Sequence, residues 1–284
     1  MATFFQAPTV EQLACILRDE GWSAPWQSLA AIQPKGAKPP FFCVHAVGGN
    51  VLSYYKMAYY LGEEQPFYGL QARGLDGEQT PRTRIEEIAA DYIKEIQTLQ
   101  PSGPYFIGGY SFGGLVAYEM ARQLHAQGQK MSVLVLFDAY TPEWLKPAPF
   151  HVQVSRHLSK LLRLELKDKL RYVKRKLIRR FYSSKPPLPP LEEAHQNAYR
   201  HYVTQVYPGR AILFRASEQP EEWLDWLQSM KIDPQLGWGK LVAGGLELEI
   251  QEVPGKHTNI FTEPYVRFLA EKLQPCLDSA QADI

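Results

Sequence analysis

Apolar residues occur along the chain in two alternating patterns, short runs and longer stretches at helical spacing. The short runs predict buried strands at residues 41–44, 67–70, 105–108, 131–137, 211–214 and 246–250. The longer stretches predict helices between them, at about 52–61, 85–99, 115–124 and 264–277. Because parallel strands need a crossover connection, which is usually a helix, this order predicts an α/β fold with a mostly parallel central sheet flanked by helices.

Two regions depart from this alternation. Residues 141–208 contain no apolar strand, and apolar and charged residues interleave there at helical spacing, which predicts a helical insertion. Near the N-terminus, Thr9 and Gln12 have the spacing of a capping box and predict a short helix within residues 1–20. Residues 21–37, rich in Pro, Ala, Gly and Ser, predict a linker, so the main domain is expected to span 38–284.

The sequence Gly109-Tyr110-Ser111-Phe112-Gly113 lies where a predicted strand meets a predicted helix. A G-x-S-x-G motif in this position is a nucleophile elbow. The glycines allow a turn too tight for side chains on its flanks, and the serine hydroxyl is exposed at a helix N-terminus, where the dipole favours developing negative charge. Ser111 is therefore the candidate nucleophile for acyl transfer.

A nucleophilic serine needs a general base and an acid that orients the base. In the chain order typical of this elbow, Asp138 follows the strand after the elbow helix and His257 follows the last predicted strand. His45, at the end of the first strand of the main domain, is the alternative base, and Asp91 and Asp76 are the alternative acids. The remaining histidines fall in or beside helical stretches and are expected at the surface: His125, His151, His157, His195 and His201.

A tetrahedral intermediate also needs two backbone N–H donors for its oxyanion. One is expected from Phe112, directly after the nucleophile, and the other from the loop after the first strand of the main domain. Gly48 and Gly49 let that loop approach closely. Val47 is therefore the expected second donor.

Length and composition narrow the classes of protein that remain. At 284 residues with 45% hydrophobic content, the chain can bury one large core or a core plus a small appendage. Its three cysteines lie far apart, which argues against a disulfide framework or a zinc site and favours a reducing compartment. Without a signal peptide or an apolar run long enough to cross a bilayer, we expect a soluble, cytoplasmic protein with no transmembrane segment. We also expect a monomer with no bound cofactor or metal.

The formal net charge of +1 conceals an uneven distribution. Residues 156–185 hold twelve Lys or Arg against two acidic residues, a net of +10, which leaves −9 for the rest of the chain. This basic insertion predicts an acidic docking partner, with Arg175, Lys176, Arg179 and Arg180 as docking residues. The alternatives are a solvated helix face, a membrane surface and a nucleic acid, but neither aromatic–basic interleaving nor a base-reading motif supports a nucleic acid.

Together these motifs resemble the thioesterase domains that end nonribosomal peptide synthetase and polyketide synthase assembly lines. The resemblance is carried by residues 42–49 (FCVHAVGG), 109–114 (GYSFGG), the strand ending in Asp138, 213–218 (LFRASE) and 255–257 (GKH). It extends from about residue 38 to the C-terminus and implies an α/β-hydrolase fold with a helical lid, residues 141–208, after the acid-bearing strand. Residues 4–14 also resemble the last helix of a carrier domain, so residues 1–20 are interpreted as a carrier remnant.

The resemblance implies that an acyl or peptidyl chain passes from the phosphopantetheine arm of a carrier protein to Ser111 and is released by hydrolysis or cyclisation. The acyl or peptidyl carrier domain would lie upstream in the same chain, and its acidic surface would give the basic lid a partner. The alternatives are a freestanding editing thioesterase, an esterase or lipase, and a noncatalytic binding module with the same fold. A noncatalytic module normally lacks a triad member, whereas Ser111, Asp138 and His257 are all present.

Overall fold

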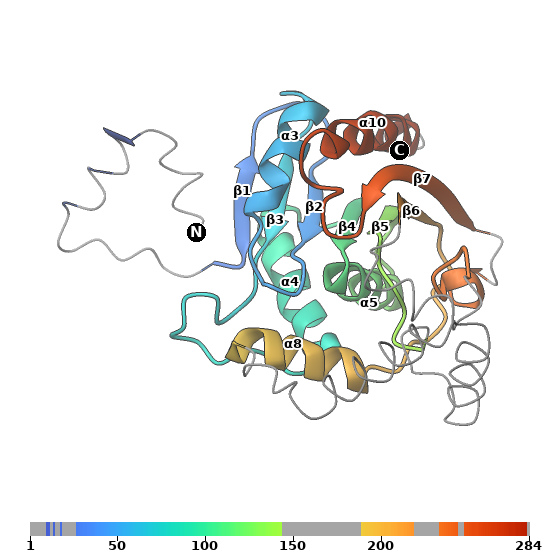
Figure 1. Cartoon of the computed structure of the whole chain (residues 1–284), viewed down its shortest axis with the longest axis horizontal. Helices are drawn as coiled ribbons and strands as arrows, with labels where there is room; N and C mark the ends of the chain where they lie inside the picture. The colour runs from blue at the N-terminus through green and yellow to red at the C-terminus, as the bar shows by residue number, and fades with distance from the viewer. Residues whose placement is uncertain are drawn as a thin grey trace, which may run out of the picture.

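A central β-sheet organises the molecule (Figure 1). The computed structural model describes residues 10–11, 14, 18, 27–143, 189–218, 233–243 and 247–282. Within these residues the sheet has seven strands in the order β1-β3-β2-β4-β5-β6-β7. They are β1 (Leu29–Gln33), β2 (Phe41–Val44), β3 (Phe67–Leu70), β4 (Tyr105–Tyr110), β5 (Met131–Phe137), β6 (Ala211–Glu218) and β7 (Leu248–Lys256). Neighbouring strands are parallel except β1 and β3, which are antiparallel.

Helices cover both faces of the sheet, as Figure 1 shows. The described α-helices are α3 (Tyr55–Leu61), α4 (Ile85–Leu99), α5 (Phe112–Ala126), α8 (Pro190–His201) and α10 (Tyr265–Ala282), and the short 3-10 helices are η1 (Leu52–Tyr54) and η2 (Trp238–Lys240). α4 and α5 pack together on one face, and α3 and α10 pack together on the other. The predicted α/β fold with a mostly parallel sheet is confirmed.

The alternation of side chains along β5 supplies both hydrophobic cores. Leu134 and Leu136 belong to the core on the α4 and α5 face, whereas Val133 and Val135 belong to the core on the α3 and α10 face. All four are at most 2% exposed. Because helices cover both faces, a central parallel strand reads in sequence as a continuous apolar run.

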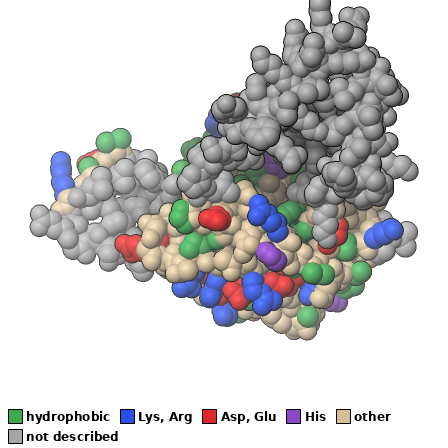
Figure 2. All heavy atoms as spheres, turned by 60° about the horizontal axis from the view of Figure 1, so that its bottom comes forward, with side chains coloured by type: hydrophobic (Ala, Val, Ile, Leu, Met, Phe, Trp, Pro, Cys, Tyr) green, Lys and Arg blue, Asp and Glu red, His purple; other side chains and the backbone are tan. Residues whose placement is uncertain are grey.

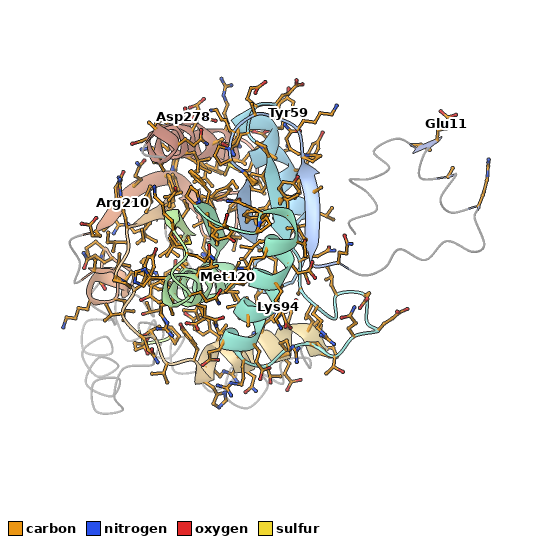
Figure 3. The ribbon with its side chains drawn as sticks, turned by 180° about the vertical axis from the view of Figure 1, so that it is seen from behind. Glu11, Tyr59, Lys94, Met120, Arg210 and Asp278 are labelled. Atoms are coloured by element: carbon orange, nitrogen blue, oxygen red, sulfur yellow. The ribbon has the colours of Figure 1, made fainter. Side chains whose placement is uncertain are left out.

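Helical spacing in turn decides which side of α4 faces the sheet. Its buried residues recur every three or four positions: Ile85, Ile88, Ala89, Tyr92, Ile93 and Ile96. Figure 3 labels Lys94 of α4 and Met120 of α5, two helices that lie side by side. The Lys94 side chain is 78% exposed, whereas Met120 is fully buried. The amphipathic pattern therefore positions α4 against both the sheet and α5.

The structure differs from the sequence prediction at residues 21–37. Within this predicted linker, residues 29–33 form β1, which pairs with β3 at the edge of the sheet. The strand sequence is Leu-Ala-Ala-Ile-Gln, and its two alanines have low strand propensity, so the segment does not resemble a strand locally. Pairing with β3 and the burial of Ala30 in the core beside α3 stabilise it instead.

Two predicted regions lie wholly or largely outside the described residues. The carrier-like helix of residues 1–20 is one, and residues 144–188 of the predicted lid are the other. The described part of the lid includes α8 and the segment that leads from it to β6. Among the described residues, no helix is both long enough and apolar enough to cross a membrane.

Candidate active site

The turn between β4 and α5 presents Ser111 at the carboxyl end of the parallel strands. Ser111 has a φ of 55°, a positive value that residues other than glycine rarely adopt, as expected for the strained turn of a nucleophile elbow. A Cβ added to Gly109 would collide with the backbone of Gly113, and one added to Gly113 would collide with the carbonyl oxygen of His45. The turn therefore accepts only glycine at these two positions, and the serine lies at the N-terminus of α5.

Ser111, His257 and Asp138 form a hydrogen-bonded series. The Ser111 Oγ and His257 Nε2 atoms are 3.0 Å apart, and the His257 Nδ1 and Asp138 Oδ2 atoms are 2.7 Å apart. Because a carboxylate accepts hydrogen bonds, Nδ1 carries the imidazole proton, and Nε2 can accept a hydrogen bond from the serine hydroxyl. The imidazole thus has the tautomer that a general base for Ser111 needs.

Asp138 directly follows β5 and is completely buried. Its Oδ1 accepts a hydrogen bond from the Ala216 backbone N–H at 2.9 Å, and its Oδ2 accepts one from the Tyr140 hydroxyl at 3.0 Å as well as one from His257. Burial, and then the charge of Asp138, raise the pKa of Tyr140, so its hydroxyl stays protonated and donates. These three donors compensate a buried carboxylate, which is costly when it is unpaired.

His257 follows β7 and is held by aromatic neighbours. The Tyr110 hydroxyl donates to the His257 carbonyl oxygen. The rings of Tyr110 and Tyr140 have their centroids 5.3 and 5.5 Å from that of the imidazole. The His257 side chain is 14% exposed. The ring is therefore oriented on several sides yet still reachable from solvent.

The two predicted oxyanion donors lie on neighbouring segments of the sheet edge. Phe112 opens α5, where the first backbone N–H groups have no acceptor within the helix. Val47 lies in the loop after β2, the strand that pairs with β4. Gly49, with a φ of 83°, turns this loop and donates its N–H to the Ala46 carbonyl at 2.9 Å. Gly113 at the start of α5 packs on the backbone at the end of β2, so both predicted donors lie beside the elbow.

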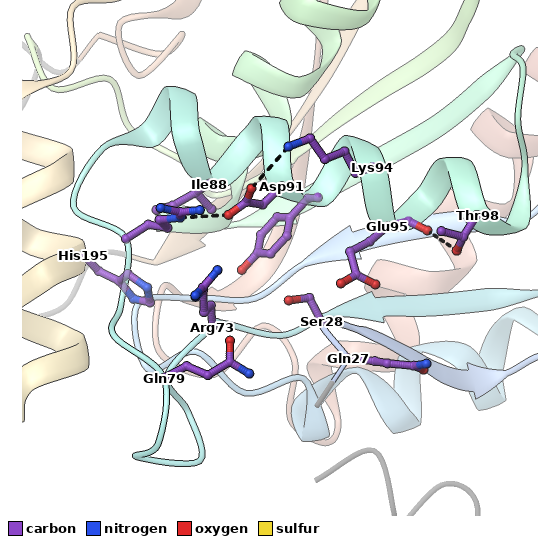
Figure 4. Close-up of a pocket in the computed structure, with 12 residues that line it drawn as sticks. Gln27, Ser28, Arg73, Gln79, Ile88, Asp91, Lys94, Glu95, Thr98 and His195 are labelled. Carbon is purple, nitrogen blue, oxygen red and sulfur yellow. Dashed lines mark hydrogen bonds and ion pairs between the residues drawn. The ribbon is translucent and has the colours of Figure 1, made fainter. Parts of the chain in front are cut away.

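The alternative base and acids have other partners. His45 is fully buried, and its Nε2 accepts a hydrogen bond from the Tyr92 hydroxyl at 2.7 Å. Burial lowers the pKa of His45 to about 3. Asp91 pairs with Arg82 at 2.8 Å beside a cavity along α4 (Figure 4). Asp76 accepts backbone N–H groups in its own turn. Asp138 and His257 are the residues that the structure brings to Ser111.

Two residues beside the site are not indicated by the sequence. Tyr140 donates to Asp138, and the only sequence signal is its place two residues after the acid. His195 was expected at the surface, but it is 2% exposed, and its Nδ1 lies 2.7 Å from the Val47 carbonyl oxygen. The prediction for His195 is wrong because α8 turns this side of the helix toward the core, where Ala198 is also buried.

The four predicted docking residues, Arg175, Lys176, Arg179 and Arg180, lie outside the described residues. Among the residues that the structure does describe, no group of three or more His, Cys, Asp or Glu could hold a metal ion. The described site therefore consists of a serine, an imidazole and a carboxylate, together with backbone donors and tyrosines.

Comparison with known protein families shows to which family the chain belongs. Residues 39–273 match the thioesterase domain family. The chain belongs to this family. The resemblance recognised in the sequence is confirmed, and with it the assignment of the chain as a hydrolase of the thioesterase class.

The curated relatives include several nonribosomal peptide synthetases. The thioesterase chain is 33% identical over 262 residues to malpinin synthetase of Mortierella alpina, a match that covers 87% of this chain and 3% of the relative. It is 43% identical over 152 residues to the dimodular nonribosomal peptide synthase of Bacillus subtilis (strain 168), a match that covers 52% of this chain and 6% of the relative. The chain thus spans only a few per cent of the length of these synthetases.

A solved thioesterase structure has the same fold. The NocB thioesterase domain, in covalent complex with a fluorophosphonate nocardicin G analogue, superposes with a TM-score of 0.64 at 23% identity. The match covers 88% of this chain and 100% of the NocB domain. This likeness confirms the α/β-hydrolase fold.

Proposed function

We propose that this thioesterase releases an acyl or peptidyl chain from the phosphopantetheine arm of a carrier protein through an acyl-enzyme on Ser111. The observation that carries the proposal is the hydrogen-bonded series from Ser111 Oγ through His257 to Asp138. A serine, a base of the correct tautomer and a buried carboxylate together are what acyl transfer to a hydroxyl needs. Membership of the thioesterase family identifies the bond as a thioester.

In the first half-reaction Ser111 Oγ attacks the thioester carbonyl carbon while His257 Nε2 takes the hydroxyl proton. The backbone N–H groups of Val47 and Phe112 stabilise the oxyanion of the tetrahedral intermediate. The C–S bond then breaks, and His257 returns its proton to the departing thiol. Asp138, held by Tyr140 and Ala216, stabilises the imidazolium that forms between these two steps.

The second half-reaction repeats the chemistry with an oxygen or nitrogen nucleophile. Water, or a hydroxyl or amine of the bound chain itself, attacks the acyl-enzyme carbonyl and gives a proton to His257. The ester bond to Ser111 breaks, and His257 passes that proton to the serine oxygen. Water yields a linear acid, whereas an internal nucleophile yields a ring.

The carrier partner is also part of this proposal. The relatives are far longer than this chain, which supports a carrier domain upstream in the same polypeptide. Figure 2 shows acidic and basic side chains interspersed on the described surface that it brings forward. Docking is assigned to residues 156–185 because their sequence has a net charge of +10. Charge reversal of Arg175, Lys176, Arg179 and Arg180 should raise KM for a carrier-bound substrate but leave KM for a small thioester unchanged. Equal effects on both substrates would contradict this docking.

The remaining parts of the proposal concern the setting of the reaction. We place it in the cytoplasm, since widely spaced cysteines suit a reducing compartment. We also infer that the chain acts as a monomer whose only prosthetic group is the phosphopantetheine of its carrier.

Intact-mass analysis after incubation with acyl-pantetheine thioesters of several types tests the function. The protein should gain the mass of one acyl group, and the gain should be absent in Ser111→Ala. Ser102→Ala, which removes an exposed serine from another turn, should retain it. Turnover that persists in Ser111→Ala would refute the acyl-enzyme, and the mass of the product would distinguish a linear acid from a ring.

A further inference from the structure

One side of α8 contacts the candidate active site at three points. Leu191 packs so closely on Gly49 that a Cβ at Gly49 would lie 2.7 Å from the leucine Cδ2 atom. His195 meets the Val47 carbonyl oxygen, and the Tyr199 hydroxyl donates to the Tyr140 carbonyl oxygen at 2.8 Å. These α8 residues are spaced four apart and therefore share one side of the helix. Although α8 belongs to the predicted lid, this side of it is bound to the site.

His195 is the most buried of these contacts. Its Nδ1 lies 2.7 Å from the Val47 carbonyl oxygen, and because a carbonyl only accepts, Nδ1 carries the proton and donates. Its ring is stacked on Phe112 with centroids 4.6 Å apart and on His45 with centroids 5.0 Å apart. Figure 4 shows His195 extending from α8 to the end of the cavity, of about 440 Å³, that runs along α4. His195 thus touches both segments that carry the proposed oxyanion donors.

Two histidines hold the two peptide groups on either side of the Val47 Cα atom. The peptide that ends in the Val47 N–H begins with the Ala46 carbonyl, which accepts from His45 Nδ1 at 2.6 Å and from the Gly49 N–H at 2.9 Å. The next peptide begins with the Val47 carbonyl, which accepts from His195. Because a peptide is planar and trans, fixing the Ala46 carbonyl oxygen also fixes the direction of the Val47 N–H. Fixing the Val47 carbonyl oxygen fixes the Gly48 N–H and so restrains the loop on the other side of the Val47 Cα atom. Burial lowers the pKa of both histidines, so each ring is neutral near pH 7.

We propose that His195 is a positioning residue for the oxyanion hole: its hydrogen bond from α8 holds the Val47 loop in the orientation that stabilises the tetrahedral intermediate. This inference rests on the proposed acyl transfer at Ser111. His45 restrains the loop from within, whereas His195 restrains it from the lid helix. The contact with α8 therefore adds a second restraint to the oxyanion loop, and this helix of the lid contributes to the chemistry.

Substitutions at His195 can separate the donor from the ring. His195→Phe keeps a ring that stacks on Phe112 but has no donor, whereas His195→Asn places an amide N–H donor near the position of Nδ1 but loses the ring. His201→Ala is the matched control, because His201 lies on the same helix and is exposed. For each variant we would measure kcat and KM with an acyl-pantetheine thioester, the rate constant for phosphonylation of Ser111 by a small fluorophosphonate, and the melting temperature.

We expect His195→Phe to lower kcat by about tenfold to a hundredfold with little change in KM, since the loop loses its restraint and a displacement of about 1 Å can cost a hundredfold. Phosphonylation should slow by a similar factor, because the phosphoryl oxygen uses the same donors. His195→Asn should recover most of both rates although it melts at a lower temperature than His195→Phe. His201→Ala should resemble the wild type.

Normal kcat and phosphonylation in His195→Phe would overturn the inference, as would rates that follow melting temperature and not the presence of a donor. If His195→Phe does not fold, His195→Ala and His195→Asn decide the question, because both lack the ring and only asparagine donates. Phosphonylation that depends on His195 without any thioester turnover in the wild type would refute the proposed function and support the positioning role. A wild type that is not phosphonylated at Ser111 would refute both.

Discussion

Substitution of Gly113 tests how closely α5 must approach the end of β2, which leads into the loop that carries Val47. In Gly113→Ala, the new Cβ would collide with the backbone carbonyl oxygens of Val44 and His45 at the end of β2. Ordinary contacts at a Cβ begin at 3.4 Å, so α5 and β2 would have to separate by about 1 Å. Neither obstacle is a flexible side chain, so no rotamer change can relieve the collision.

The magnitude follows from this geometry. Overpacking of a core typically costs about 1–3 kcal/mol, and an unyielding backbone contact is expected at the upper end of that range. At about 2–4 °C for each kcal/mol, the melting temperature should fall by about 6–12 °C. Because Val47 lies just beyond His45, a separation of about 1 Å displaces one oxyanion donor from Ser111 and should lower kcat by about a hundredfold.

Gly48→Ala is the matched substitution, since an added Cβ there would find its nearest neighbour at 3.9 Å, the Asn50 amide nitrogen. Its melting temperature should lie close to that of the wild type. The assay is thermal unfolding by circular dichroism together with steady-state turnover of an acyl-pantetheine thioester. If Gly113→Ala melts and turns over like the wild type, α5 does not contact β2 as closely as described and the reasoning is refuted.

Three further predictions concern the acid, the anchoring of α8 and the response to pH. Asp138→Asn should fold, because asparagine tolerates the φ of 43° at this position. Its kcat should fall about 10⁴-fold, because the imidazole would be held in the wrong tautomer, whereas the kcat of Asp91→Asn should be unchanged. Tyr202→Phe removes a donor to the buried Glu119 carboxylate, 2.7 Å away, and should lower the free energy of unfolding in urea by about 1.5–3 kcal/mol. Buried tyrosines have their pKa raised above the unfolded value of about 10, so stability should be complete below pH 10 and fall above it, by up to about 1.4 kcal/mol per pH unit for each tyrosine. Free energies of unfolding from urea titrations at pH 8 and pH 11 check this. The tyrosines with a raised pKa are Tyr54, Tyr92, Tyr110, Tyr118, Tyr140, Tyr199, Tyr202 and Tyr207.

The sequence predicted the central strands and the residues at their ends because both depend on local patterns. β5 was predicted at residues 131–137, where it lies in the structure, since a strand buried on both faces is a continuous apolar run. Asp138 was a candidate because it directly follows such a strand, and His257 because it lies in the loop after the last predicted strand, 246–250. The carboxyl ends of parallel strands meet at one edge, and there the two side chains are hydrogen-bonded. Chain order was then enough to place both beside Ser111.

The contacts of α8 could not be predicted in this way. The side that α8 turns to the core includes His195 and Tyr199, residues with polar atoms that local patterning assigns to a surface. These polar atoms are satisfied by carbonyl oxygens of loops more than fifty residues away in sequence. Strand β1 was not predicted for a related reason, because it is stabilised by its pairing with β3 and not by its own composition. What the sequence does not show is which distant backbone groups a segment will meet.

The backbone conformation at Ser111 and Asp138 connects the fold with the chemistry. Both residues have positive φ, 55° and 43°, a conformation that costs about 1–3 kcal/mol for a residue other than glycine. Each is held there by its own N–H, which bonds to the strand next to it: Ser111 to the Phe137 carbonyl at 2.9 Å, and Asp138 to the Phe214 carbonyl at 2.7 Å. The parallel ladder therefore continues one residue beyond β4 and β5, and it keeps both side chains turned toward His257 against the preference of their own backbone. A sheet that is buried on both faces can sustain this strain, which is why the site lies at the ends of its central strands and not at β1.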